Sequence, residues 1–144
     1  MKNEIYGNLI LETEYWKLFL APSQRYLGTS VLSLKRECPS LKDLNNDEWE
    51  EFIKFVKTIE TLYNKLFKPD LFNWGCLKNK SFRDKNPKPE IHWHIHPRYG
   101  KSFEFMGVKF EDKEFGYPPS GKEVKIDENV QIAIVNLIKE NLVF

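Results

Sequence analysis

The sequence predicts an α+β fold, in which an antiparallel sheet of about five strands packs against two helices. Short runs of aromatic and aliphatic residues that end at turn residues indicate the strands. Two longer stretches with apolar residues every three or four positions indicate the helices. With 144 residues, 41% of them hydrophobic and 15% aromatic, the chain can bury one core, and we expect residues 1–144 to form a single domain.

Four runs are predicted as strands. Residues 15–20 and 29–34 are expected to pair as a hairpin joined by residues 23–26, and residues 71–77 and 91–96 are the next two candidates. The stretch between the last two is polar, basic and proline-containing, which is typical of a surface loop. Residues 99–121 alternate aromatic and charged residues with Gly and Pro, so we expect short strands or irregular structure there.

Two amphipathic helices complete the predicted fold. In the first, Asn46 is the expected N-cap and Pro69 prevents continuation. Its apolar positions recur at helical spacing and indicate a core-facing stripe, namely Trp49, Phe52, Ile53, Val56, Ile59, Leu62, Tyr63 and Leu66. The second helix is expected within residues 124–142, capped near Asp127.

The charge and cysteine content exclude several classes of protein. Lys and Arg number 22 and Asp and Glu 21, so the formal charge of +1 does not favour a nucleic-acid or membrane-surface binder. Cys38 and Cys76 are too few for a disulfide framework and too far apart for a C-x-x-C pair. The sequence shows neither a signal peptide nor a membrane span, so we expect a cytoplasmic protein.

All three histidines fall within the last predicted strand, at positions 92, 94 and 96. Side chains two residues apart share one face of a strand, so these imidazoles project together, and Glu90 joins them. A single histidine is more often a satisfied core or surface residue. Three on one face, with apolar residues between them, favour a function, because clustered polar groups need partners.

Two chemistries use such a cluster. A neutral imidazole can attack phosphorus while its neighbours donate hydrogen bonds to phosphate oxygens. Alternatively, His92 and His94 with Glu90 or His96 are candidate zinc ligands. The residue types alone leave both open.

The surrounding sequence favours the first chemistry. The stretch Asn-Pro-Lys-Pro-Glu-Ile-His-Trp-His-Ile-His-Pro-Arg-Tyr, residues 86–99, resembles the signature of the histidine-triad (HIT) family of nucleotide hydrolases and transferases. Residues 24–36 resemble the first hairpin of the family, residues 41–48 its helix entry and residues 72–79 the following strand. Residues 110–116 resemble a C-terminal extension of one bacterial and archaeal branch. The resemblance implies a domain core over about residues 10–100 and an extension over about 101–144.

Two registers of the triad are conceivable. Read literally, residues 92, 94 and 96 form it and His94 is the nucleophile. In the family, however, the middle histidine lies five residues before the Pro-Arg pair, and a side-chain amide lies eleven residues before the first triad position. Pro97 and Asn79 then both place Glu90 first, His92 as the nucleophile and His94 third. We adopt this second register, in which His96 is an additional histidine.

The resemblance implies a nucleotide hydrolase that works through a nucleotidyl-histidine intermediate and releases a nucleoside monophosphate. Its substrate would be a dinucleoside polyphosphate or a nucleoside phosphoramidate, without a metal or cofactor. His92 and His94 are the expected catalytic residues, and the expected substrate- and phosphate-binding residues are Asn79, Glu90, His96 and Arg98. A further phosphate contact is expected from Ser81, Arg83 or a lysine of the same loop. The partners implied are a nucleotide and a second copy of the chain, as a homodimer.

Glu90 departs from the family pattern, which has a histidine at the first triad position. A carboxylate there can make the neighbouring imidazole more basic, or can repel a phosphate. A nucleotide-binding module with weak or no catalysis is therefore the first alternative function, and a zinc protein the second.

Overall fold

A computed structural model describes residues 5–144 and has an antiparallel five-stranded sheet in the order β1-β2-β3-β5-β4. The strands are β1 (Asn8–Glu12), β2 (Trp16–Leu20), β3 (Ser30–Leu34), β4 (Leu71–Gly75) and β5 (His92–Arg98). The predicted hairpin is confirmed, since β2 pairs antiparallel with β3. The β5 strand lies between β3 and β4, so the histidines stand on an interior strand of the sheet.

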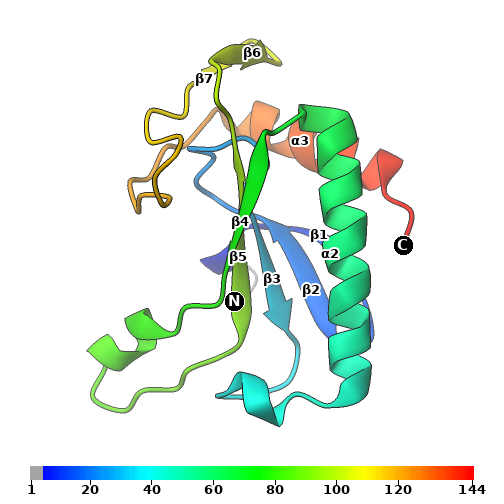
Figure 1. Ribbon diagram of the computed structural model, residues 1–144, viewed down its shortest axis with the longest axis vertical. Helices are drawn as coiled ribbons and strands as arrows, with labels where there is room; N and C mark the ends of the chain where they lie inside the picture. Colours follow the sequence, from blue (N-terminus) through cyan, green and yellow to red (C-terminus); the bar gives the residue numbers. More distant parts are fainter. Residues whose placement is uncertain (1–4) are drawn as a thin grey trace.

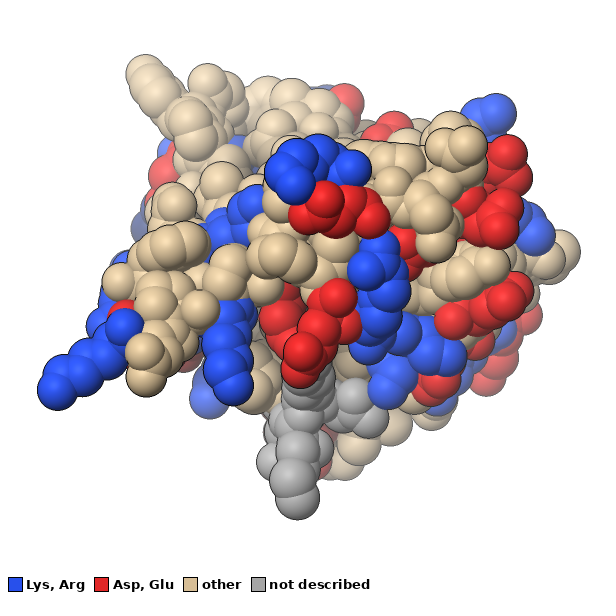
Figure 2. Space-filling view, turned by 90° about the horizontal axis from the view of Figure 1, so that it is seen from below, with Lys and Arg blue, Asp and Glu red and all other residues tan. Residues whose placement is uncertain are grey.

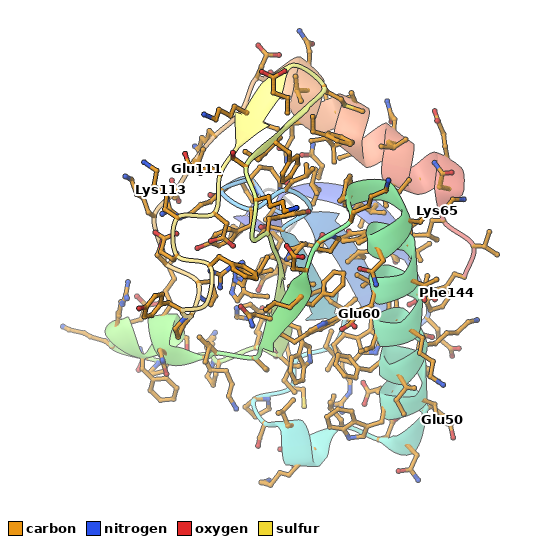
Figure 3. All side chains as sticks on the ribbon, turned by 45° about the horizontal axis from the view of Figure 1, so that its top comes forward. Glu50, Glu60, Lys65, Glu111, Lys113 and Phe144 are labelled. Atoms are coloured by element: carbon orange, nitrogen blue, oxygen red, sulfur yellow. The ribbon has the colours of Figure 1, made fainter. Side chains whose placement is uncertain are left out.

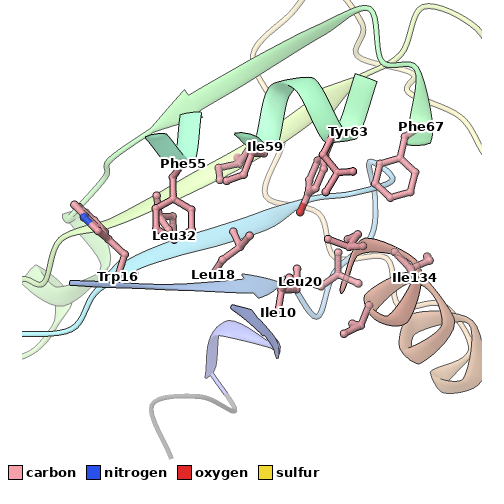
Figure 4. Packing of buried hydrophobic residues seen from close by; sticks show 14 of the residues in the cluster. Ile10, Trp16, Leu18, Leu20, Leu32, Phe55, Ile59, Tyr63, Phe67 and Ile134 are labelled. Atoms are coloured by element: carbon pink, nitrogen blue, oxygen red, sulfur yellow. The ribbon is translucent and has the colours of Figure 1, made fainter. Parts of the chain in front are cut away.

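One face of the sheet carries the hydrophobic core beneath helix α2 (Asn46–Phe67). Phe55, Ile59, Tyr63 and Phe67 point from α2 toward the strands in Figure 4, where they meet side chains of β1, β2 and β3. Helix α3 (Glu128–Asn141) packs against β1 and adds Ile134 to the same cluster. The α+β prediction is therefore confirmed.

In the segment between β5 and α3, the first part lies beyond the ends of β4 and β5, where Phe105 contacts Phe67 of α2, and the turns that follow lie on the side of the sheet away from α2 (Figure 1). It holds a two-stranded sheet of β6 (Phe103–Phe105) and β7 (Val108–Phe110), followed by turns. In Figure 3, Glu111 and Lys113 on this segment are well separated from Glu50, Glu60 and Lys65 on α2. The face of the sheet that carries the histidines is thus partly covered by the extension rather than by a helix.

Three local predictions need correction. The N-cap of α2 is Asn45, not Asn46, because the Asn45 side chain accepts a hydrogen bond from the Glu48 N–H and Glu48 reciprocates. Within α2, Ile53 is 52% exposed while Phe55 is buried, so the core stripe is centred on Phe55. The predicted loop between β4 and β5 contains a short 3₁₀ helix, η2 (Asn79–Arg83).

The C-terminal helix is confirmed, since Glu128–Asn141 lies within the predicted residues 124–142 and Asp127 is its N-cap as expected. The strand β1 was not predicted, because only Ile10 of its five residues is buried. A second 3₁₀ helix, η1 (Leu41–Asp43), precedes α2.

Candidate active site

The three imidazoles project from one face of β5, as the alternation of the strand predicts. Trp93 and Ile95 belong to the core cluster on the other face. The ring centroids of His92 and His94 are 5.1 Å apart, and those of His94 and His96 are 6.0 Å apart with nearly parallel planes. The structure therefore brings the predicted histidines together as one row on the face away from α2.

His92 has a fixed ring orientation at the start of this row. Its Nδ1 lies 2.9 Å from the backbone carbonyl oxygen of Glu90. Because a carbonyl oxygen only accepts, Nδ1 carries the proton of this hydrogen bond, and in that tautomer the lone pair lies on Nε2. The Tyr6 ring lies against this end of the row, with its centroid 5.4 Å from that of His92, and Tyr6 in turn contacts Phe19 at 5.7 Å.

His94 and His96 are held as neutral imidazoles. Burial, followed by the neighbouring His92, lowers the pKa of His94. Burial, with smaller contributions from His94 and Arg98, lowers the pKa of His96 to about 4. The Nδ1 atom of His96 is buried without a hydrogen-bond partner, and the ring meets Tyr26 edge-on at 5.8 Å. Both rings can donate or accept hydrogen bonds at neutral pH without carrying charge.

Arg98 is fully buried, and its five N–H groups are all engaged. Its guanidinium donates two hydrogen bonds to the carboxylate of Asp112, at 2.7 and 3.0 Å. The other three go to the side-chain oxygen of Asn73 and to the carbonyl oxygens of Glu114 and Tyr117. In this arrangement Arg98 ties the extension to the sheet and has no donor left for a phosphate, which differs from the binding role expected from the sequence.

The loop between β2 and β3 holds the other side of the extension. Arg25 forms an ion pair with Glu114, and the hydroxyl of Tyr26 accepts a hydrogen bond from the Ser120 N–H at 3.1 Å. The Arg98 guanidinium lies over the Tyr26 ring, 4.6 Å from its centroid. Residues 116–121, which we call the strap, are therefore held in place from two elements of the core fold.

A pocket of about 720 Å³ lies between the sheet and the strap. The sheet side is formed by β4 and β5, with Asn73, Gly75, His94 and His96 among its lining residues, and the strap side includes Tyr117. His92 is outside this lining and lies next to His94. The row of imidazoles thus runs from the Tyr6 and Phe19 side into the pocket.

The remaining predicted residues lie around this arrangement. Glu90 is half-buried just before β5 and supplies the carbonyl that orients His92. Asn79 is exposed at the start of η2 and does not line the pocket. Arg83 is exposed, and Ser81 is half-buried and bonds to the carbonyl of Lys78. Figure 2 shows lysine and arginine side chains at the tip of the projecting β4–β5 loop.

Sequence reasoning missed Asn73 and the strap. A signal for Asn73 was present, because Leu71, Asn73 and Gly75 alternate with Phe72 and Trp74 along β4. That alternation places an amide on the histidine face. The strap carries no comparable pattern, and its position depends on the buried partners of Arg98.

The described part of the chain, residues 5–144, contains no group of three His, Cys, Asp or Glu side chains placed to hold a metal ion. The arrangement of the imidazoles therefore gives no support to the zinc alternative. Within the same residues, no helix is both long and apolar enough to cross a membrane.

Comparison with solved structures relates the whole arrangement to known proteins, whereas no protein-family model and no curated protein sequence matches the chain. A histidine triad protein from Bradyrhizobium japonicum superposes with a TM-score of 0.75 at 15% identity, over 97% of this chain and 92% of that one. One from Sinorhizobium meliloti gives 0.74 at 18% identity, over 96% and 92%. A hypothetical histidine triad nucleotide-binding protein from Sulfolobus tokodaii gives 0.66 at 15%, over 95% and 84%. The sheet, the helices and the histidine strand of this chain thus form the histidine triad fold.

Proposed function

We propose that the protein hydrolyses a nucleotide derivative at its α-phosphorus, with the Nε2 atom of His92 as the nucleophile. The observation that carries this proposal is the hydrogen bond from Nδ1 of His92 to the Glu90 carbonyl, at 2.9 Å. It leaves the Nε2 lone pair available for attack and fixes the plane of the ring. Within residues 5–144, neither the His94 ring nor the His96 ring makes a hydrogen bond to a backbone carbonyl, which supports His92 over His94 as the nucleophile.

The reaction has two steps. The Nε2 atom forms a bond to phosphorus while the bond to the leaving group breaks, and the leaving group takes up a proton. Water then attacks phosphorus, loses a proton, and displaces the imidazole, so a nucleoside monophosphate is released and His92 is restored. A neutral His94 is suited to donate a hydrogen bond to a phosphate oxygen in both steps.

The nucleoside is proposed to lie toward Tyr6, which contacts His92, and toward Phe19 of the β2–β3 hairpin, which contacts Tyr6. The family resemblance implies that the first hairpin holds base and ribose. Asn79 and the loop cations are exposed and do not line the pocket, and their proposed phosphate contact would come from the β4–β5 loop. We propose that Arg98 does not contact substrate and instead holds the extension against the sheet.

The test is release of AMP from adenosine 5′-phosphoramidate and from diadenosine triphosphate. His92→Ala is expected to lower the rate by at least roughly a thousandfold, since the covalent step is lost. Lys109→Ala, on the exposed side of β7, is the matched control and should keep the wild-type rate. A nucleotidyl adduct trapped and located on His94 by mass spectrometry would overturn the assignment of His92.

Two observations favour a binding module with weak catalysis as the second candidate. Glu90 lies two residues before His92, and Arg98, the one arginine that lines the pocket, has all five donors engaged. The negative charge on the phosphate oxygens in the transition state would then be stabilised by uncharged hydrogen-bond donors alone. Calorimetry with AMP beside the turnover assay separates the candidates, because a pure binding module shows heat of binding and no product.

We also propose a homodimer, which the family resemblance implies, and a cytoplasmic location, which the sequence leads us to expect. Strands β1 and β4 are the two edges of the sheet, and Leu71 of β4 is 39% exposed. Light scattering at two protein concentrations measures the oligomeric state. A monomer mass at micromolar concentration would refute the expected dimer.

A further inference from the structure

The pocket beneath the strap carries an inference about which substrates the proposed site accepts. It begins at His94, next to the proposed nucleophile, and extends over β4 to the strap. Its volume of about 720 Å³ falls within the range of small-molecule pockets, roughly 300–1,000 Å³. It is therefore large enough for a substituent carried on the same phosphorus as the nucleoside.

The lining of this pocket provides no cation that a ligand could use. No lysine lines it, and its one arginine, Arg98, donates all five hydrogen bonds to protein oxygens. The two imidazoles at its inner end, His94 and His96, have pKa values lowered by burial, so both are neutral at pH 7. A polyphosphate chain placed there would lose water without gaining a counter-charge, which is costly.

The walls of the pocket are largely apolar. Leu71 and Leu77 contribute from the β4 side, and Tyr117, Pro118 and Pro119 contribute from the strap. Proline and tyrosine side chains present rigid, flat surfaces, which suit a planar ring. Asn73 offers one oriented polar group: its oxygen accepts from Arg98 at 2.9 Å, so its NH₂ group points away from the guanidinium.

We propose that the strap pocket binds an uncharged aromatic substituent on the phosphorus, so that the substrate class is a nucleoside 5′-monophosphate amide or ester with an aromatic leaving group. The inference rests on the proposed function of the histidine row. The leaving nitrogen or oxygen keeps the electron pair of its bond to phosphorus and takes up one proton. A dinucleoside polyphosphate, whose leaving group is a charged phosphate chain, is a poor substrate.

The substrate test compares three compounds on the wild-type chain: the benzylamide of AMP, the 2-methoxyethylamide of AMP and diadenosine triphosphate. The two amines have similar basicity, so their amides differ mainly in the aromatic ring. We expect kcat/KM for the benzylamide to exceed the other two values by at least about tenfold, since burying a ring contributes more than the 1.4 kcal/mol of a tenfold change.

Gly75 provides a variant that fills the pocket. A Cβ atom built on it would meet only the Cγ atom of Leu77, at 4.0 Å, so a larger side chain enters open space. Gly75→Leu is expected to abolish the preference for the benzylamide over the small amide, and Gly75→Ala is the matched control that keeps most of it. Tyr117→Ala removes part of the pocket wall and leaves the histidines unchanged. It should reduce the ratio of kcat/KM for the benzylamide to kcat/KM for the small amide by about threefold or more.

The outcomes separate the inference from the proposed function. A wild-type preference for diadenosine triphosphate, or a benzylamide preference that Gly75→Leu leaves intact, overturns the pocket assignment while hydrolysis stands. If no compound is hydrolysed, calorimetry decides: tighter binding of the benzylamide than of the small amide, lost in Gly75→Leu, supports the pocket although the hydrolase proposal fails. Equal binding of the two amides overturns the pocket as well.

Discussion

The guanidinium of Arg98 and the carboxylate of Asp112 form a bidentate ion pair in which both side chains are 1% exposed. Asp112 also accepts a hydrogen bond from the Tyr99 N–H, at 3.2 Å. A pair of this geometry fixes both direction and distance. It joins the end of β5 to the extension.

Removing the carboxylate leaves a buried, uncompensated cation. Asp112→Ala is therefore expected to lower the free energy of unfolding by roughly 3–5 kcal/mol, measured by urea denaturation. Glu111→Ala, at the exposed neighbouring position, should change it by less than about 0.5 kcal/mol. Equal stability of the two variants would contradict the role assigned to the Arg98–Asp112 pair.

The start of α2 distinguishes two adjacent asparagines. Asn45→Ala removes a side chain that caps the Glu48 N–H, and should destabilise the protein by about 1 kcal/mol. Asn46→Ala changes an exposed position in the first turn, where Ala is the better helix former, and should not lower the stability by more than a few tenths of a kcal/mol. Thermal unfolding of both variants is the measurement, and the reverse order would restore Asn46 as the cap.

Protonation of His96 should destabilise the fold in acid. Its pKa is about 4 in the folded chain, against 6.5 for an ordinary histidine, so the unfolded chain takes up the proton first as the pH falls. The neutral His96 ring contributes to the free energy of unfolding in full above pH 6.5, and this contribution is lost between about pH 6.5 and pH 4. It amounts to about 3 kcal/mol at 1.36 kcal/mol per pKa unit.

The pH dependence of unfolding in His96→Asn isolates this contribution. The difference between the wild-type and variant stability curves should change across that pH window and be flat above it. Parallel curves from pH 7.5 to pH 4 would show that His96 titrates normally, as would an NMR titration of its ring with an ordinary midpoint.

Gly28 lies at φ +87°, and a Cβ atom there would approach Phe67 at 3.1 Å and Pro97 at 3.3 Å. Gly28→Ala should therefore destabilise the protein by about 1–3 kcal/mol, through backbone strain and crowding. Gly121→Ala is the control, because a Cβ atom at this position meets nothing within 4 Å. The stability of this variant should not fall below that of the wild type. Calorimetric melting of the pair tests both expectations, and a neutral Gly28→Ala would refute the strain argument.

The parts of the fold that were predictable are those in which local pattern and burial agree. Helix α2 repeats apolar residues at helical spacing, and β5 alternates histidines with core residues, so both could be recognised from the chain alone. Strand β1 could not, because Leu9 and Leu11 are only partly buried and a bulge lies between them. Its pairing with β2 is what makes it a strand.

The site divides in the same way. The row of imidazoles follows from period two on a strand. The commitment of Arg98 does not, because its partners lie 14 to 25 residues away, at Asn73, Asp112, Glu114 and Tyr117. A sequence shows that an arginine follows the histidines, but only the folded chain shows which oxygens surround it.

The strap is built from a stretch of chain separate from the strand that holds the imidazoles, and it meets the core fold through Arg98 and Tyr26. Substitutions in residues 117–120 can therefore change the shape of the pocket without moving His92 or His94. In the proposed hydrolase, the choice of leaving group and the reactivity at phosphorus would then be set by different segments of the chain.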